Sequence, residues 1–235
     1  MDWLDEINSN VPEYDEVYSE IENDETEWRK DRLGMVTGSQ VGKLVVKSKD
    51  KQSYTLSNSK TTKNLIYKIA WERLLKSGNI SNGLGRLNIS SKEMEHGNDY
   101  EGEAIKKYIE VTGREVISEQ RFVKDSDWLG GTPDGFVGTD GLIEVKCPFN
   151  GGNHLKSMLE GVIYNEDYLY QMQSYLLITN RKWCDFVTYD PDLIESLQLN
   201  IIRVERDEEI IEGIKLVVQM VSEKIQEIIN NQKLK

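Results

Sequence analysis

The segment Trp128–Pro148 constrains the fold more than any other part of the sequence. Its second half alternates as a β-strand does, so Glu144 and Lys146 share one face and the residues between them point to the other. Upstream, Asp134 stands in a Pro-Asp-Gly turn, and a hairpin closed by the glycines that follow would bring its carboxylate beside Glu144. Two convergent carboxylates next to an ammonium group favour a hard divalent cation such as Mg²⁺. The alternative is a twisted hairpin with a surface ion pair.

The chain carries 29 basic and 41 acidic residues, a net charge of −12, which argues against a nucleic-acid partner until the distribution is considered. Residues 1–27 hold eleven of the acids and no Lys or Arg, so the remainder is nearly neutral. Residues 28–63 hold nine basic and two acidic residues, a local balance of +7. Phosphate contacts follow local charge, so this segment is either a DNA-binding surface or a solvated loop. The DNA contacts predicted from it are Lys43, Lys47, Lys49 and Lys51.

Length and composition fit one α/β domain of 235 residues. The two cysteines, Cys147 and Cys184, are too few for a disulfide framework or a four-cysteine iron–sulfur cluster, and we expect both to be buried as small hydrophobic residues. No run of apolar residues is long enough to cross a bilayer, and no basic-then-apolar leader opens the sequence. We therefore expect a cytoplasmic protein without membrane contact.

Periodicity predicts helices and strands in alternating groups. The helices expected are one or two amphipathic ones in residues 1–27, then 62–77, 91–112 and 164–179, and a long one capped by Asp207. Short strands are expected at 115–122, 128–130, 135–137 and 142–147, as an antiparallel meander, and again at 183–189 and 199–204. Residues 47–60 are polar without clear periodicity and indicate an exposed loop.

An anion site is indicated between Trp28 and Val46. Ser39 is placed to cap a helix that runs to Leu44, and the free amides at such a helix start bind anions. Arg32 and Thr37 flank the same point.

Two further polar residues lie on apolar helical faces. Glu101 shares the inward stripe of its helix with Ala104 and Ile105, and Gln171 shares a row with Tyr168 and Tyr175. Glu101 could also be an edge position whose carboxylate reaches solvent, and Gln171 could satisfy a buried backbone group. The only histidines, His96 and His154, do not have metal-site spacing.

Four blocks of sequence resemble one family in the same order along the chain. Gly131-Thr-Pro-Asp-Gly135 and Glu144-Val-Lys-Cys-Pro-Phe149 resemble the phage lambda exonuclease and YqaJ-like viral recombinase family of PD-(D/E)XK nucleases. Residues 28–39 are similar to its W-x-x-x-R-x-G-x-x-T-x-S motif. His96–Glu101 resembles its G-x-x-Y-E helix, and Tyr168-x-x-Gln171-x-Gln173 resembles the helix whose Gln faces the metal site. The resemblance is weaker in the final third.

The resemblance implies an α+β, restriction-endonuclease-like fold with a central mixed β-sheet flanked by helices. It implies one nuclease domain over residues 1–235, made of an acidic helical segment (1–27), the nuclease core (28–205) and a C-terminal helix (206–235). The implied activity is a Mg²⁺-dependent 5′–3′ exonuclease, with Mn²⁺ able to substitute, acting on linear double-stranded DNA in a bacterial host cell. It would leave a 3′ overhang for a single-strand annealing protein and assemble as a homotrimeric ring.

The resemblance also assigns roles to residues. Asp134, Glu144 and the Val145 backbone carbonyl would hold the metal, and Lys146 would position the attacking water. Glu101 and Gln171 would complete the catalytic group. The residues expected to bind a terminal 5′-phosphate are Arg32, Thr37, Ser39 and Thr132. Two alternatives stay open, an endonuclease of the same superfamily and a non-catalytic DNA-end-binding module.

Overall fold

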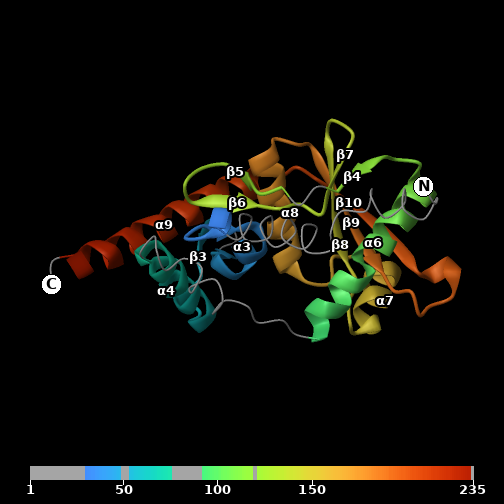
Figure 1. Cartoon of the computed structure of the whole chain (residues 1–235), viewed down its shortest axis with the longest axis horizontal. Helices are drawn as coiled ribbons and strands as arrows, with labels where there is room; N and C mark the ends of the chain where they lie inside the picture. Colours follow the sequence, from blue (N-terminus) through green and yellow to red (C-terminus); the bar gives the residue numbers. More distant parts are fainter. Residues whose placement is uncertain (1–29, 49–52, 76–91, 119–120, 234–235) are drawn as a thin grey trace, which may run out of the picture.

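The structure is a computed structural model that describes residues 30–48, 53–75, 92–118 and 121–233 (Figure 1). The helices expected in residues 1–27 lie outside these ranges, as do Lys49 and Lys51. Among the described residues, no helix is long and apolar enough to cross a membrane.

A five-stranded mixed sheet organises the chain. Its spatial order is β10 (Leu199–Glu205), β9 (Trp183–Tyr189), β8 (Gly141–Lys146), β7 (Gly135–Val137) and β4 (Val116–Ile117). The central pair β8–β9 is parallel and every other pair is antiparallel, which confirms the predicted central mixed sheet.

Helices cover both faces of this sheet. Side chains along β8 alternate between the two faces, so each one contacts the helix on its own side. Leu142 joins the hydrophobic cluster on the side of α8 (Glu166–Thr179). Ile143 and Val145 join the cluster formed with α6 (Lys92–Thr112) on the other side. Both helices match the expected ones, whereas α7 (Gly151–Glu160) was not predicted. The strand is therefore buried on both faces, as its almost unbroken burial shows.

A second sheet corrects the predicted antiparallel meander. Strands β5 (Val123–Lys124) and β6 (Leu129–Gly131) do not pair with the main sheet but form a three-stranded sheet with β1 (Val36–Thr37). The β1–β6 pair is parallel, and this long-range pairing carries no local sequence signal. The chain passes from β6 into β7 through Thr132, Pro133 and Asp134, so these residues connect the two sheets.

The segment after β1 differs from the expectation in two places. Helix α3 (Gly38–Leu44) has Thr37, and not Ser39, at its N-cap position. The expected loop at 47–60 contains part of a hairpin, in which β2 (Val45–Lys47) pairs with β3 (Tyr54–Leu56). Tyr54 is buried at 6 % exposure, and one apolar ring in a polar stretch is too weak a pattern to predict a strand.

The remaining helices are close to the predicted ones. Helix α4 (Lys60–Leu74) begins at the Ser59 cap, whose hydroxyl accepts a hydrogen bond from the Thr62 amide. The short 3₁₀ helix η2 (Glu195–Leu197) precedes β10. Helix α9 (Glu208–Lys233) is capped by Asp207, whose carboxylate accepts from the amides of Glu209 and Ile210, as expected.

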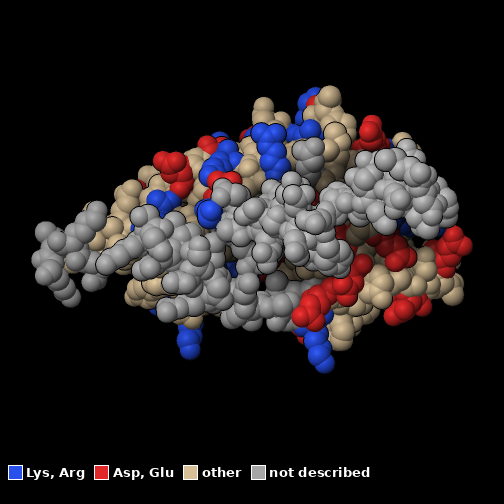
Figure 2. Space-filling model, in the orientation of Figure 1, with Lys and Arg blue, Asp and Glu red and all other residues tan. Residues whose placement is uncertain are grey.

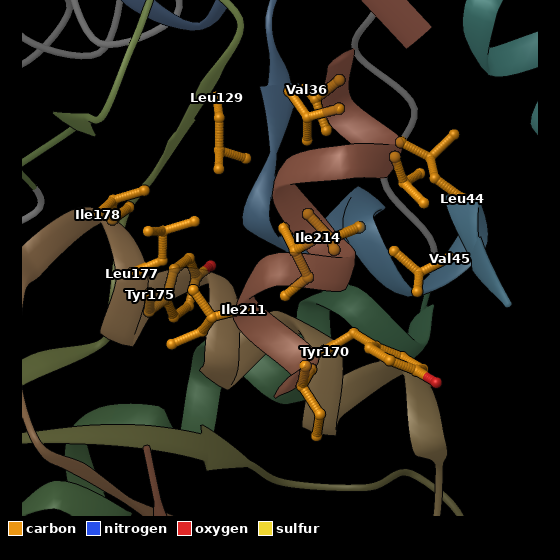
Figure 3. Close-up of a cluster of buried hydrophobic side chains, with 14 of the residues drawn as sticks. Val36, Leu44, Val45, Leu129, Tyr170, Tyr175, Leu177, Ile178, Ile211 and Ile214 are labelled. Carbon is orange, nitrogen blue, oxygen red and sulfur yellow. The ribbon is translucent and has the colours of Figure 1, made fainter. Parts of the chain in front are cut away.

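The main hydrophobic core joins the second sheet to α3, α8 and α9 (Figure 3). Figure 3 shows Val36 of β1 and Leu129 of β6 facing the same cluster as Ile211 and Ile214 of α9. The apolar stripe of α9 is therefore part of the hydrophobic core. This is one of the two roles expected for it, the other being a subunit interface. Cys147 and Cys184 are buried and unpaired, as predicted.

A buried carboxylate fixes α6 to the main sheet. Asp185 of β9 is 1 % exposed and accepts hydrogen bonds from Tyr108 Oη of α6 at 2.7 Å and from Arg114 Nη1 at 3.1 Å. Arg203 of β10 adds two more from Nε and Nη2, at 2.8 and 2.9 Å. Such a buried acid is tolerated only because its oxygens are fully paired with donors and opposite charge.

We predict that Asp185→Asn lowers the free energy of unfolding by about 3 kcal/mol, because two guanidinium groups then lose their counter-charge. Urea denaturation followed by circular dichroism measures this. Asp192→Asn, which changes an exposed carboxylate, should stay within about 0.5 kcal/mol of wild type. A loss of less than about 1 kcal/mol for Asp185→Asn would show that the network does not stabilise the fold.

Candidate active site

The site forms where β8 extends past β7. The β7–β8 ladder runs from Val137 opposite Gly141 to Gly135 opposite Ile143, so Glu144–Lys146 have no β7 partner. Gly138, with φ of 52°, supplies the left-handed residue that closes the hairpin. Asp134 Oδ2 accepts a hydrogen bond from the Val145 amide at 2.7 Å, in place of a strand-to-strand hydrogen bond. The structure thus brings Asp134 next to the Glu144–Lys146 segment, as the hairpin predicted.

Glu144 is fully buried between β8 and α8. Its Oε1 accepts a hydrogen bond from Gln171 Nε2 at 2.6 Å and pairs with the Lys146 ammonium. Its Oε2 has no hydrogen-bond partner among the described residues. A buried carboxylate oxygen without a donor is costly, so this atom needs either a proton or a cation.

Lys146 lies at the end of β8 with 23 % of its side chain exposed. Besides Glu144, its Nζ donates to the Val145 carbonyl at 3.1 Å and lies 5.2 Å from the ring centroid of Tyr168. Burial lowers the pKa of the ammonium, but Glu144 and Asp134 raise it more, so its pKa stands well above the usual range. Lys146 is therefore a permanent cation at this site.

Glu101 reaches the same group from α6, on the opposite face of the sheet, and its side chain is half-buried. Burial, followed by repulsion from Asp134, raises the pKa of Glu101 to about 7. Burial and the same neighbour raise the pKa of Glu144 to about 8, and burial also raises the pKa of Asp134. Three carboxyl groups thus lie near one ammonium group. The repulsion between the carboxylates favours a further positive charge beside them.

The donor set fits a hard divalent cation. Asp134, Glu144 and the Val145 carbonyl offer oxygen atoms only, which is what Mg²⁺ selects, and Glu144 Oε2 lacks a partner. Within the described ranges, no three His, Cys, Asp or Glu side chains form a complete cluster ready to hold a metal ion.

The residues expected to bind a phosphate lie on or next to the paired strands β1 and β6 in the sequence, and Arg32 precedes β1. Thr37 of β1 pairs with Gly130 of β6, two residues before Thr132, and its Oγ1 lies 3.3 Å from the Ser39 hydroxyl. Thr37 is 4 % exposed and Ser39 is exposed. Arg32 stands at the end of the helical stretch before β1, and its carbonyl accepts a hydrogen bond from the Met35 amide. The parallel β1–β6 pair places Thr37 toward the end of β6 that leads to Asp134, whereas Arg32 comes before β1 in the chain.

The predicted DNA-binding lysines are only partly described. Lys43 is exposed on α3, and Lys47 is exposed on β2, where its Nζ lies 3.5 Å from Glu209 and over the ring of Tyr54. An exposed ion pair of this kind contributes little to stability.

Comparison with known proteins identifies the family. Residues 27–182 match the YqaJ-like viral recombinase domain. The chain belongs to this family. A crystal structure of an alkaline exonuclease, LHK-Exo, from Laribacter hongkongensis is similar to it, with a TM-score of 0.73, 29% identity, and coverage of 88% of this chain and 95% of the other.

Two more solved structures support the fold. LHK-Exo in complex with dAMP gives a TM-score of 0.74 and 31% identity over 88% of this chain and 95% of the other. A phage-related exonuclease from Haemophilus somnus 129PT gives 0.62 at 19% identity over 84% and 96% of the two chains, which supports the fold alone. No curated protein matches the sequence. The α+β fold is thus that of the lambda-exonuclease-like nucleases, and the predicted membership is confirmed.

One residue of this YqaJ-like site was not predicted. Tyr175 is buried one turn after Gln171, whose Nε2 donates to the Tyr175 hydroxyl at 3.1 Å. The ring is so close to two glycines that a Cβ on Gly38 or Gly131 would lie 2.2 or 2.4 Å from its Cε1 atom. The helical row containing Gln171 and Tyr175 was visible in the sequence, but the contact with the two glycines was not.

Histidine plays no part in this group. His154 is buried, and its ring nitrogens lie 2.9 Å from Thr188 Oγ1 and 2.8 Å from the Leu197 carbonyl. These bonds tie α7 to β9 and to η2, so the role of His154 is structural.

The raised pKa of Glu144 predicts how stability depends on pH in metal-free protein. The folded state holds a proton on Glu144 up to about pH 8, whereas an unfolded glutamate loses it near its ordinary value of 4.5. Between these values the folded state binds more protons, so this residue contributes stability at low pH that is lost as pH rises to about 8.

Glu144→Gln mimics the protonated form and should therefore gain stability relative to wild type as pH rises from about 5 to 8.5. Thermal melting in EDTA across this range measures the difference. Glu160→Gln, an exposed substitution at the end of α7, should follow wild type throughout. A constant difference between Glu144→Gln and wild type would contradict the raised pKa.

Proposed function

We propose that this YqaJ-like protein is a metal-dependent exonuclease that degrades one strand of linear double-stranded DNA from the 5′ end. It would leave a 3′ single strand for an annealing protein. The observation that carries the proposal is the convergence of Asp134, Glu144 and Lys146 where β8 extends past β7, with one Glu144 oxygen buried and unpartnered. The likeness to an alkaline exonuclease, at 29% identity over 88% of this chain, and to the same enzyme bound to dAMP supports the substrate class.

Each residue of the site has a task in this reaction. Asp134, Glu144 and the Val145 carbonyl would hold Mg²⁺, or Mn²⁺ in its place. The bound cation would neutralise charge developing on the phosphate and make water a better nucleophile. Lys146 keeps its proton and directs N–H bonds toward the attacking water or a phosphate oxygen, which positions them for in-line attack.

Glu101 and Gln171 support this group differently. Glu101, with a pKa near 7, can accept a proton at neutral pH or orient a water from the α6 side. Gln171 holds Oε1 of Glu144 and so leaves Oε2 facing the site. Its direct partner is Glu144 and not Lys146, so it acts by positioning the carboxylate.

Asp134→Ala should reduce cleavage at least tenfold, because losing a charged metal ligand is worth several kcal/mol of barrier. Linear 5′-phosphorylated duplex is incubated with Mg²⁺, and released nucleotides are measured alongside duplex binding without Mg²⁺. Asp140→Ala is the matched control, since Asp140 lies in the same hairpin and pairs with Lys182 instead. More than about a tenth of wild-type activity in Asp134→Ala would reject its role.

The same assay separates the alternatives. Covalently closed circular DNA should remain intact, and EDTA should abolish cleavage of linear duplex. Cutting of the circle would indicate an endonuclease, and tight end binding without cleavage would indicate a non-catalytic module.

Strand polarity requires a pocket for the terminal phosphate, and we assign Arg32, Thr37, Ser39 and Thr132 to it. A guanidinium binds phosphate by two parallel hydrogen bonds, and neighbouring hydroxyls add neutral donors. Thr37 and Thr132 stand toward the end of β6 that leads to Asp134, which supports a phosphate pocket near the metal-binding carboxylates. Lys43, Lys47, Lys49 and Lys51 would hold the duplex beyond the pocket.

Arg32→Ala should lose most of the preference for 5′-phosphorylated over 5′-hydroxyl ends, about 1.5 to 3 kcal/mol for a hydrogen bond to a charged group. The ratio of kcat/KM for the two substrates measures the preference. Lys68→Ala, which removes an exposed cation paired with Glu72 on α4, should leave the ratio unchanged. Equal slowing of both substrates by Arg32→Ala would place the pocket elsewhere.

A homotrimeric ring around the DNA is also proposed, on the family resemblance. It would reconcile the net charge of −12 with DNA binding, because only the inner surface contacts phosphate. On the face shown in Figure 2, Asp and Glu side chains gather over α6, whereas Lys and Arg lie mainly near β5 and β6. Sedimentation equilibrium at micromolar concentration gives the oligomeric state directly.

A further inference from the structure

Three aromatic rings form a row beside the proposed active site. Phe149 meets His96 at a centroid distance of 5.5 Å with an interplanar angle of 90°, and His96 meets Tyr100 at 4.8 Å and 62°. His96 and Tyr100 stand four residues apart on α6, so they occupy one stripe of that helix. The row therefore crosses from the segment after β8 to α6.

Both ends of the row adjoin residues of the site. Phe149 follows Lys146 by three residues, and Tyr100 directly precedes Glu101. Three residues of chain span at most about 11 Å. A DNA strand advances about 3.4 Å per nucleotide, so the row lies within reach of the first few nucleotides on either side of the cleaved bond.

Phe149 differs from the other phenylalanines in its exposure to solvent. It is 60 % exposed, and it is the one phenylalanine among the exposed large hydrophobic residues of the described ranges. Phe136 and Phe186 pack against the main core instead. A ring left this exposed forgoes part of the roughly 1.5 to 3 kcal/mol that full burial of a phenylalanine would contribute.

The Phe149 ring is accessible to a ligand. An edge-to-face contact engages at most one face of a ring, and 60 % of Phe149 is exposed. His96 contacts the Phe149 ring, and Tyr100 in turn contacts His96. An aromatic face held in this way stacks on a nucleobase without regard to its identity, because every base has a π-face.

We propose that Phe149, held by His96 and Tyr100, is the platform on which a base of the cleaved strand stacks next to the active site. The inference rests on the proposed nuclease function and adds a contact to the base, which the carboxylates, Lys146 and the phosphate pocket do not supply. Stacking there would orient the nucleotide whose phosphate is attacked and would apply equally to all sequences.

The test combines variants of Phe149 with abasic substrates. Phe149→Ala, Phe149→Leu and Phe149→Trp are each assayed on 5′-phosphorylated duplexes that carry one abasic nucleotide at the first, second or third position of the cleaved strand. Binding is measured in Ca²⁺ and single-turnover cleavage in Mg²⁺. Leu159→Ala is the matched control, because Leu159 is 79 % exposed on α7.

Phe149→Ala and Phe149→Leu should weaken binding of intact duplex about 5- to 100-fold, whereas Phe149→Trp and Leu159→Ala should stay near wild type. One abasic position should weaken wild-type binding by a similar factor and have no further effect on Phe149→Ala, as expected for two halves of one contact. Unchanged thermal melting of the variants separates a lost contact from a lost fold.

Two results would overturn the platform. In the first, Phe149→Ala loses binding to the abasic duplexes by the product of the two separate factors, at every abasic position. In the second, Phe149→Leu binds intact duplex as tightly as wild type. Either result would show that the ring does not stack on a base. If the wild-type protein cleaves linear duplex and either of these results is also obtained, the nuclease function stands and the platform alone is rejected. A wild type that neither binds nor cuts DNA would reject both.

Discussion

The arrangement of this protein depends on one buried carboxylate. Glu144 lies on the central strand of a mixed sheet, fully removed from solvent, and Lys146 and Gln171 satisfy only one of its two oxygens. A core position of this kind normally holds an aliphatic residue. Placing an acid there raises the pKa of Glu144 to about 8, through burial first and Asp134 second, and creates a demand for positive charge. The fold therefore holds a buried carboxylate whose charge the surrounding residues compensate only in part.

Much of this site follows from local sequence. A two-residue period fixed which side chains of β8 face α8 and which face α6, and the Pro-Asp-Gly turn with its glycine-closed hairpin placed Asp134 beside Val145. The inward direction of Gln171 followed from helical periodicity. These inferences succeed because each concerns residues within one strand, helix or hairpin, where backbone geometry alone decides which side chains meet.

What the sequence could not supply is long-range pairing. Strand β6 pairs with β1, about ninety residues earlier, and with β5 forms a sheet separate from that of β4 and β7. Hairpin strand β3 is held by burial of Tyr54, whose ring packs edge-on to Tyr170 of α8. The Asp185 network likewise joins three segments that are distant in sequence. The roles of the site residues, in contrast, remain proposals.

The position of Tyr175 has a consequence for the glycines that surround it. Its ring is wedged between Gly38 of α3 and Gly131 of β6, and its hydroxyl accepts from the same Gln171 amide that holds Glu144. A side chain at either glycine would collide with this ring. Two residues without any functional group therefore fix the place of the Gln171 amide and, through it, of the Glu144 carboxylate.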